Sequence, residues 1–124
     1  MTATEPLNRL LPQRLGMVVR MQAQPGRRAG LLDALHRYAD RLAEEPATEI
    51  FVISLDPDEH DVVWLHEWFH TDAGVNAHRS APAFAELMHE LSDLLAAPPG
   101  IMRFEPLRVH LATQLLDEEA ASDF

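Results

Sequence analysis

The 124-residue sequence contains neither cysteine nor lysine, and these two absences exclude several kinds of chemistry. Without cysteine the chain has no thiol nucleophile, no disulfide, no cysteine-ligated zinc and no iron–sulfur cluster. Without lysine it forms no Schiff base and has no phosphate-binding P-loop. The composition is 47% hydrophobic, which is enough for a packed core, and the length fits one domain.

The charge of the chain is strongly one-sided, with 20 acidic and 10 basic residues and a formal net charge of −10. Because a polyanion would be repelled and no basic stripe with aromatic residues occurs, we expect no nucleic-acid partner. No apolar run has the length that a membrane-spanning helix needs, so we expect no membrane partner. Residues 1–15 lack the basic start and apolar stretch of a secretory signal, which predicts a cytoplasmic location.

Residue patterns of period two and β-branched content predict four strands. The strands are expected at residues 15–24, 48–56, 61–69 and 101–113. A turn at Pro57 joins the second and third strands into a hairpin. Pro106 interrupts the last strand, which indicates an edge position or a bulge.

Helical periodicity predicts two main helices, one over residues 27–45 and one that begins at Pro82. A short helix is expected to begin at Thr71-Asp72 and to run through His78. Residues 1–14 are expected to form an N-terminal extension with one short helical turn. Residues 15–112 form the domain, and residues 113–124 form an acidic C-terminal tail.

The resulting order, β-α-β-β-α-β, is typical of the ferredoxin-like α+β fold. The second and third strands are apolar on both faces. This pattern predicts a sheet that helices cover on one side and a second subunit covers on the other.

The segment from Val63 to His78 is the richest in chemistry, because it holds both tryptophans of the chain. On a strand Trp64, His66 and Trp68 share one face. Two indole rings and a titratable group on one face suit a pocket for a planar aromatic ligand. The alternative is a core of large aromatic side chains with a hydrogen-bonded histidine.

The same segment contains His66-Glu67-Trp68-Phe69-His70, which matches the H-E-x-x-H zinc motif. That motif binds zinc on a helix, where both histidines lie one turn apart on one face. On a strand, residues four apart are separated by roughly 13 Å, so the two could not share one ion. A strand is the favoured interpretation here, and we expect no metal site.

The order of these elements, together with several short motifs, resembles the antibiotic biosynthesis monooxygenase family. The matching segments are Ala23-Gln24-Pro25-Gly26-Arg27, Glu45-Pro46, Ile50-Phe51-Val52-Ile53, Glu67-Trp68, Ala77-His78 and Ala81-Pro82-Ala83-Phe84. The resemblance covers about residues 15–112. It implies a dimeric α+β barrel, a homodimer in which each subunit has a pocket between its sheet and its helices.

The resemblance also implies an activity, because some family members are quinol monooxygenases or anthrone oxygenases. These enzymes use O₂ on an electron-rich aromatic, quinol or polyketide-type substrate, without metal, flavin or haem. The expected cofactor is therefore none, and the expected partners are a small aromatic substrate and O₂. Such chemistry needs a dry aromatic pocket and one or two proton-handling groups. The alternative is a non-catalytic dimer of the same fold that binds a small aromatic or only another protein.

Residue by residue, the resemblance matches Trp68 to the family's strand-end tryptophan, which lines the pocket in anthrone oxygenases. His78 matches the histidine of the family's Ala-His segment. Trp64 stands where anthrone oxygenases can have an asparagine, so the polar contact to a substrate oxygen is missing. The haem-degrading branch has an asparagine where this chain has Val19, and its helix histidine falls on Met88, which disfavours haem degradation.

The candidate catalytic residues are therefore Trp68, His78 and His66. The histidine that handles the proton stays open between His66 and His78, and His78 could instead bond its own helix end. The candidate substrate-binding residues are Trp64, Phe51, Phe84 and Met88. Glu67 is expected to pair with Arg20, across strands or across the dimer.

Overall fold

The computed structural model describes residues 7–10, 12–112 and 114–117, which fall into two compact units. The larger unit is Gln13–Glu105. The smaller unit combines segments from both ends of the chain: β1 (Leu7–Leu10), β6 (Arg108–Leu111) and α4 (Gln114–Asp117). Within the described residues, no helix is long and apolar enough to cross a membrane.

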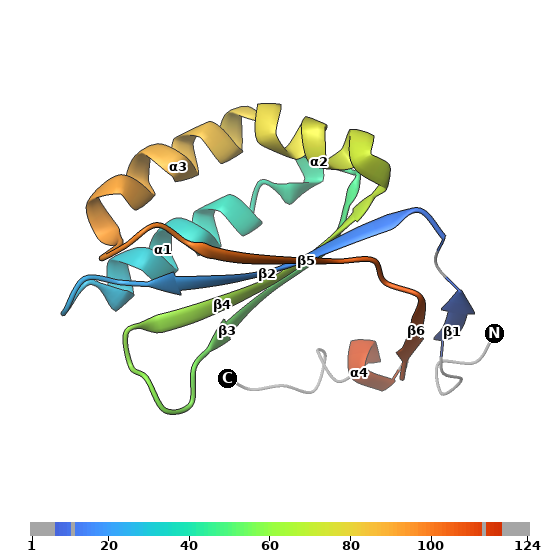
Figure 1. Ribbon diagram of the computed structural model, residues 1–124, viewed down its shortest axis with the longest axis horizontal. Coiled ribbons are helices and arrows are strands. Elements are labelled where there is room, and N and C mark those ends of the chain that lie inside the picture. Colours follow the sequence, from blue (N-terminus) through green and yellow to red (C-terminus); the bar gives the residue numbers. More distant parts are fainter. Residues whose placement is uncertain (1–6, 11, 113, 118–124) are drawn as a thin grey trace. The chain divides into compact units, whose positions relative to one another are not determined.

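The larger unit has the ferredoxin-like order that the sequence predicts (Figure 1). Its elements are β2 (Arg14–Gln22), α1 (Arg28–Ala39), the 3₁₀ helix η1 (Leu42–Glu44), β3 (Thr48–Leu55), β4 (Val62–His70), α2 (Thr71–Ser80), α3 (Pro82–Leu94) and β5 (Gly100–Phe104). The four strands pair antiparallel in the order β3-β4-β2-β5. The helices lie on one face of this sheet, which confirms the α+β prediction.

Local chemistry explains where the elements begin and end. Gly26 adopts a φ of 78° after Pro25, a left-handed conformation that favours glycine and ends β2. Pro82 occupies the first turn of α3, where its missing N–H costs nothing. The long helix expected over residues 27–45 ends instead at Ala39 and continues as the separate turn η1.

The core lies between the helices and one face of the sheet. Met17, Val19 and Met21 of β2 alternate into it, as the sequence predicts. On β4 the side chains of Leu65, Glu67 and Phe69 are buried there. The core is completed by α1 and α3 residues, namely Leu31, Leu35, Tyr38, Leu87, Leu91 and Leu94.

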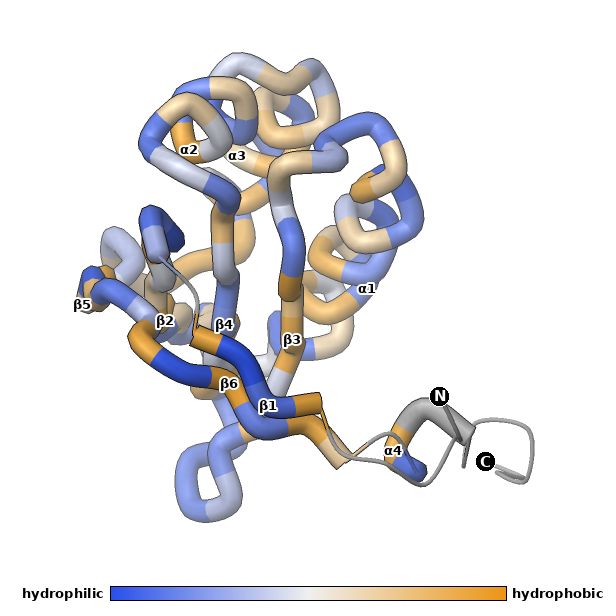
Figure 2. Tube along the Cα trace, turned by 90° about the vertical axis from the view of Figure 1, so that its right-hand side faces the viewer, coloured by the Kyte–Doolittle hydropathy of each residue, from blue (hydrophilic) through white to orange (hydrophobic). Residues whose placement is uncertain are grey.

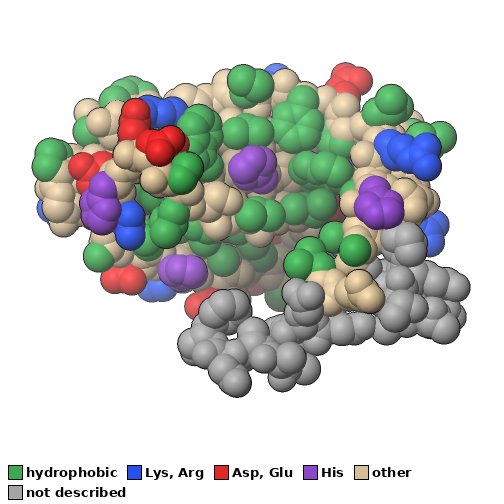
Figure 3. All heavy atoms as spheres, turned by 90° about the horizontal axis from the view of Figure 1, so that it is seen from below, with side chains coloured by type: hydrophobic (Ala, Val, Ile, Leu, Met, Phe, Trp, Pro, Cys, Tyr) green, Lys and Arg blue, Asp and Glu red, His purple; other side chains and the backbone are tan. Residues whose placement is uncertain are grey.

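The helices α1, α2 and α3 of the larger unit all lie on the core face of its sheet (Figure 1). β4 presents Trp64, His66 and Trp68 to the other face. Hydrophobic side chains gather across this face, with histidines among them (Figure 3). The register places Val52 and Met102 in the same cross-strand row as His66, and their exposures are 43% and 67%. We call this surface the open sheet face.

The smaller unit differs from the prediction. The helical turn expected in residues 1–14 is wrong for the described part, because Leu7–Leu10 is a strand. This strand, β1, pairs antiparallel with β6, and the two lie side by side (Figure 2). The single strand expected at 101–113 is two strands, β5 and β6, and Pro106 lies in the gap between them. Residues 1–6 and 11 of the predicted N-terminal extension, and residues 113 and 118–124 of the predicted acidic tail, lie outside the described residues. The described part of the tail, Gln114–Asp117, is the helix α4.

Candidate active site

A small cavity of about 120 Å³ lies between the helices and the core face of the sheet. Most of its lining is apolar, from all four strands and from α3. The apolar lining residues are Met17, Val19, Met21, Phe51, Leu65, Phe84, Leu87, Met88, Pro99 and Ile101. Four residues that can hydrogen-bond also line it: Tyr38, Glu67, His78 and Arg79. The cavity thus combines an apolar lining with a small number of polar groups, as ligand sites commonly do.

His78 is the centre of the polar group. It lies on α2 with 6% of its surface exposed. Its Nδ1 atom is 2.8 Å from Oε1 of Glu45 and 2.7 Å from the Tyr38 hydroxyl. The Tyr38 hydroxyl also donates a hydrogen bond of 2.9 Å to Oε1 of Glu45. Three buried side chains from α1, η1's C-terminal end and α2 therefore meet at one point.

These contacts fix which nitrogen of His78 carries the proton. A carboxylate only accepts hydrogen bonds, so Glu45 accepts one from Tyr38 and one from His78 Nδ1–H. In the neutral imidazole Nε2 is then the unprotonated nitrogen. Nε2 lies 3.8 Å from Oε1 of Glu67, which is beyond hydrogen-bond length. The arrangement leaves His78 Nε2 able to accept a proton from a bound molecule.

Burial raises the pKa of the Glu67 carboxyl to about 7, and the negative charge of Glu45 adds to this shift. The neutral form of Glu67 is therefore much more populated at neutral pH than that of an exposed glutamate. Burial and the bond to Glu45 also raise the pKa of Tyr38, so its hydroxyl stays protonated and remains a donor. The other oxygen of Glu45, Oε2, is buried without a hydrogen-bond partner among the described residues. Such groups are uncommon and are often functional.

Aromatic rings hold the imidazole of His78 in place. The Phe84 ring centroid is 4.3 Å from that of His78, and the Phe69 centroid is 5.0 Å away. Tyr38 is itself packed edge-on against Phe51 at 5.4 Å. The ring and its hydrogen-bond partners are thus packed on both sides.

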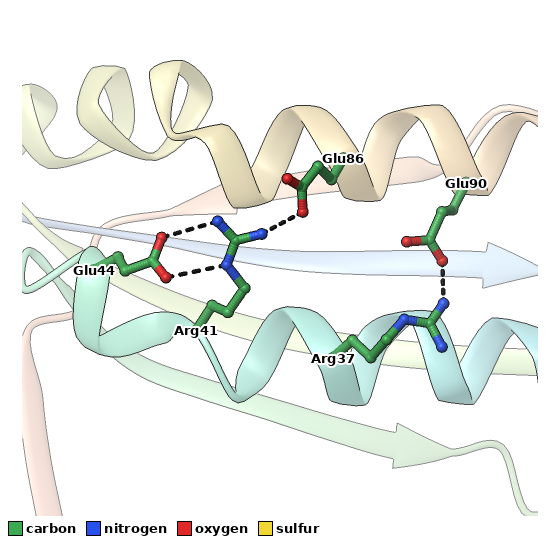
Figure 4. A network of polar contacts seen from close by, with 5 residues as sticks. All are labelled: Arg37, Arg41, Glu44, Glu86 and Glu90. Atoms are coloured by element: carbon green, nitrogen blue, oxygen red, sulfur yellow. Dashed lines mark hydrogen bonds and ion pairs between the residues drawn. The ribbon is translucent and has the colours of Figure 1, made fainter.

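Ion pairs join the two long helices that lie above the cavity (Figure 4). Arg37 of α1 pairs with Glu90 of α3. Arg41, just after α1, pairs with Glu86 of α3 and with Glu44 of η1. These residues are exposed enough that each pair contributes little to stability, but together they join α1 and η1 to α3.

The structure brings four of the predicted site residues together. His78, Phe51, Phe84 and Met88 all line the cavity. His78 bonds Glu45 and Tyr38 through its side chain rather than its own helix end.

The other three predicted site residues, Trp64, His66 and Trp68, lie on the open sheet face, away from the cavity. The indole Nε1 of Trp64 donates a 2.9 Å bond to Asp56. The alternation that grouped these three residues is confirmed, but they share no cavity with His78 in this chain. Their roles as catalytic or substrate-binding residues stay predictions.

Glu67 does not pair with Arg20 within the chain. Arg20 is directly opposite Trp64 in the β2–β4 register and binds Glu59 at 2.9 Å. Glu67 faces the core instead. Sequence reasoning missed Tyr38 and Glu45 as site residues, because they reach His78 from distant segments. For Glu67 a signal existed, since an acid between the core residues Leu65 and Phe69 needs a buried partner.

The zinc motif does not assemble. His66 and His70 are exposed on β4, whereas Glu67 points to the core. Within the ranges that the structure describes, no group of three or more histidine, aspartate or glutamate side chains has an arrangement that could hold a metal ion.

The architecture and the site define a ferredoxin-like α+β protein with a buried, hydrogen-bonded histidine at an apolar cavity. The family model of the antibiotic biosynthesis monooxygenases matches residues 14–90, more than half of the sequence. The chain therefore belongs to the antibiotic biosynthesis monooxygenase family. No curated protein matches it.

Several solved structures share this fold. A protein from Chloroflexus aurantiacus, assigned to the antibiotic biosynthesis monooxygenases, is 24% identical with a TM-score of 0.68, and the match covers 76% of this chain and 93% of that one. One from Caulobacter crescentus, with the same assignment, is 17% identical with a TM-score of 0.74, over 79% and 93%. A Nitrosomonas europaea protein of unknown function is 29% identical with a TM-score of 0.66, over 74% and 87%.

Proposed function

We propose that the chain is a cofactor-independent monooxygenase that uses O₂ on an electron-rich aromatic, quinol or polyketide-type substrate. The observation that carries the proposal is the buried pair of Glu45 and His78, 2.8 Å apart, with His78 Nε2 left as a proton acceptor in an apolar cavity. A base that is held in one tautomer by a carboxylate is a recurrent device for activating a hydroxyl group.

The first step is removal of a proton. A phenolic hydroxyl at His78 Nε2 gives its proton to that nitrogen, and the negative charge of Glu45 stabilises the imidazolium. Tyr38 donates to the same carboxylate and so keeps it oriented. The phenolate that forms is a much better electron donor than the phenol.

The second step uses O₂. The phenolate gives one electron to O₂, and the phenoxyl radical and superoxide that result combine at a ring carbon to form a C–O bond. The outer oxygen then takes a proton. The neutral carboxyl of Glu67, whose Oε1 atom is 3.8 Å from His78 Nε2, can donate that proton. Loss of the proton on the same carbon then breaks the O–O bond, the outer oxygen leaves as water, and a carbonyl remains. In sum, a phenol and O₂ give a quinone and water.

The cavity lining suits this chemistry. Phe51, Phe84 and Met88 offer apolar and polarisable contact to an aromatic ring. The low polarity strengthens the interaction between the imidazolium and the phenolate. It also keeps water from a reactive peroxide.

We further propose that the chain acts as a homodimer through the open sheet face. Support comes from the exposure of apolar side chains there, including Val52 and Met102. A contiguous apolar surface of this kind commonly marks a protein interface.

The alternative is a non-catalytic dimer that binds a small aromatic. Both functions use the cavity, but only the oxygenase needs the proton acceptor. Replacement of His78 by Gln therefore separates them, because it removes the base while it leaves most of the cavity volume.

The experiment is O₂ uptake by the purified, metal-stripped protein with a panel of hydroquinones, dihydroxynaphthalenes and anthrones. We expect saturable O₂ uptake, with one O₂ consumed and one water formed for each substrate molecule. The rate of uptake should fall at least a hundredfold in His78→Gln. The matched control is His36→Gln, at an exposed position on α1, which is expected to stay within about twofold. Equal uptake by His78→Gln would overturn the proposal, and so would uptake that returns only with added metal.

A further inference from the structure

A second hollow, of about 430 Å³, lies beside the cavity at the C-terminal end of α3. Its lining comes from the last turns of α3 and from the segment that leads into β5. The lining residues are Met88, Leu91, Ser92, Leu95, Ala96, Ala97, Pro98 and Pro99. We call it the outer hollow, and the 120 Å³ cavity beside His78 the inner cavity.

The two spaces adjoin at a pair of residues that line both. These are Met88 of α3 and Pro99, just before β5. Met88 is 39% exposed, and a thioether chain with three rotatable bonds can change rotamer at little cost. Pro99 has a fixed φ and stays in place. The two spaces are therefore separated by Met88, which can change conformation, and by Pro99, which is rigid.

Size limits what each space can hold. A cavity of roughly 150 Å³ in another protein binds benzene, so the 120 Å³ inner cavity accommodates about one ring. Any substrate with more apolar bulk than one ring must extend out of it. The outer hollow, at 430 Å³, is more than three times larger and is the adjoining space on the Met88 side.

The two linings differ in polarity. The inner cavity has the proton-handling groups of Glu67 and His78. The outer hollow has no charged lining residue, and the hydroxyl of its single polar residue, Ser92, already donates to the carbonyl of His89 at 2.7 Å. Nothing in that lining favours a charged or strongly hydrogen-bonding group, so its complement is an apolar group.

We propose that the ligand is an amphiphilic single-ring phenol or hydroquinone with an apolar substituent, and that the substituent passes Met88 into the outer hollow. The ring and its hydroxyl occupy the inner cavity against His78. This inference deepens the proposed oxygenase function, because it names the substrate class of that site. Met88 is then a specificity-determining residue rather than a part of the general cavity wall.

The test is a binding series measured by calorimetry under nitrogen, with hydroquinone and its methyl, propyl, butyl and hexyl derivatives. Complete burial of a methylene is worth about fourfold in affinity, and partial burial in an open hollow about twofold. We therefore expect the dissociation constant to fall about twofold to fourfold for each added methylene. An affinity that is independent of chain length overturns the inference, and so does an absence of binding by every member.

Filling the outer hollow tests its location. Ser92→Phe places a ring in it at an exposed helix position, and Asp93→Phe adds the same bulk one residue further along α3, outside the lining. We expect Ser92→Phe to weaken hexylhydroquinone binding at least tenfold and hydroquinone binding less than twofold, with Asp93→Phe close to the unmodified protein. Equal effects of the two variants would contradict the assignment, as would a fused tricyclic phenol that binds as tightly as the hexyl compound.

Binding under nitrogen separates this inference from the proposed activity. Chain-length-dependent binding without O₂ uptake on admission of air would reject the oxygenase and leave the substrate class standing. O₂ uptake that has the same KM for every chain length would support the oxygenase and reject the outer hollow.

Discussion

His78 and Glu67 face each other across 3.8 Å, from α2 and from β4, at a distance slightly too long for a hydrogen bond. On its far side His78 is bonded at Nδ1 by Glu45 and Tyr38. The imidazole therefore has one occupied side and one side that faces a carboxyl group with a pKa of about 7. A hydroxyl oxygen beside this gap, within hydrogen-bond distance of both groups, could give a proton to one and take a proton from the other.

The elevated pKa of Glu67 predicts a specific dependence of stability on pH. An unfolded glutamate titrates near 4.5 and the folded one near 7, so the folded state holds the proton more tightly. The free energy of unfolding should fall as the pH rises from about 4.5 to about 7, and this term amounts to about 3 kcal/mol. Below pH 4.5 the stabilising term is complete.

Glu67→Gln isolates that term. The amide does not ionise, so between pH 4 and pH 8 the stability of the variant relative to the unmodified protein should increase by about 3 kcal/mol, as measured by urea unfolding. Glu105→Gln, at an exposed carboxyl, is the control and should show no such gain. A difference between Glu67→Gln and the unmodified protein that is independent of pH would contradict the raised pKa.

Glu45 should act as a positioning residue for His78. Glu45→Gln keeps an oxygen for the Nδ1–H bond but removes the negative charge that stabilises the imidazolium. We expect a loss of roughly a hundredfold in turnover, with little change in KM. Nitrogen chemical shifts of the His78 ring report the tautomer directly, and a mixture of Nδ1–H and Nε2–H forms in the variant is expected. An unchanged single tautomer would argue against this role.

A charge on the open sheet face should prevent dimer formation. Val52→Glu puts a carboxylate into the apolar row beside His66, in a chain that already has a net charge of −10. Leu55→Glu is the matched control, because it lies on the same strand, is 51% exposed and is paired with the core residue Val63. Sedimentation or light scattering should give a monomer for Val52→Glu and a dimer for Leu55→Glu. Dimers from both variants would reject the open sheet face as the interface.

The junction of β4 and α2 stores backbone strain. Thr71 follows β4 directly and has a φ of 71°, which a β-branched residue rarely adopts. Thr71→Gly should remove a penalty of about 1–2 kcal/mol. Thr71→Ala keeps the Cβ atom and should not remove it. Thermal unfolding of both variants measures the difference, and the same melting temperature for Gly and Ala would mean that the position is unstrained.

Much of the larger unit was predictable because its signals are local. The alternation of Met17, Val19 and Met21 and the proline at the start of α3 each need only a few neighbouring residues. The same holds for the shared face of Trp64, His66 and Trp68. Which face of the sheet holds the cavity was not predictable from that alternation. The cavity forms where α1 and α3 pack on the core face. Its size depends on the distance between these helices and the sheet, which no local sequence pattern encodes.

The polar site illustrates the same limit. Tyr38, Glu45 and His78 are separated by long stretches of chain and meet only in the folded protein. The prediction therefore placed two tryptophans and two histidines at the centre of the site. In the structure only His78 of these four lines the cavity. β1 was missed for a related reason, because its partner strand lies at the other end of the described chain.

The pairing of β1 with β6 has a consequence for the order of folding. Leu7 is opposite Leu111, so this ribbon closes a loop of about a hundred residues, and the entropy of that closure is lost before any of its hydrogen bonds form. A two-stranded ribbon recovers little of this loss by itself. The hydrogen bonds between β1 and β6 should therefore form last during folding. In the folded protein they should open more often than the whole chain unfolds. Backbone amides of β1 and β6 should exchange with deuterium well before those of β2 and β4.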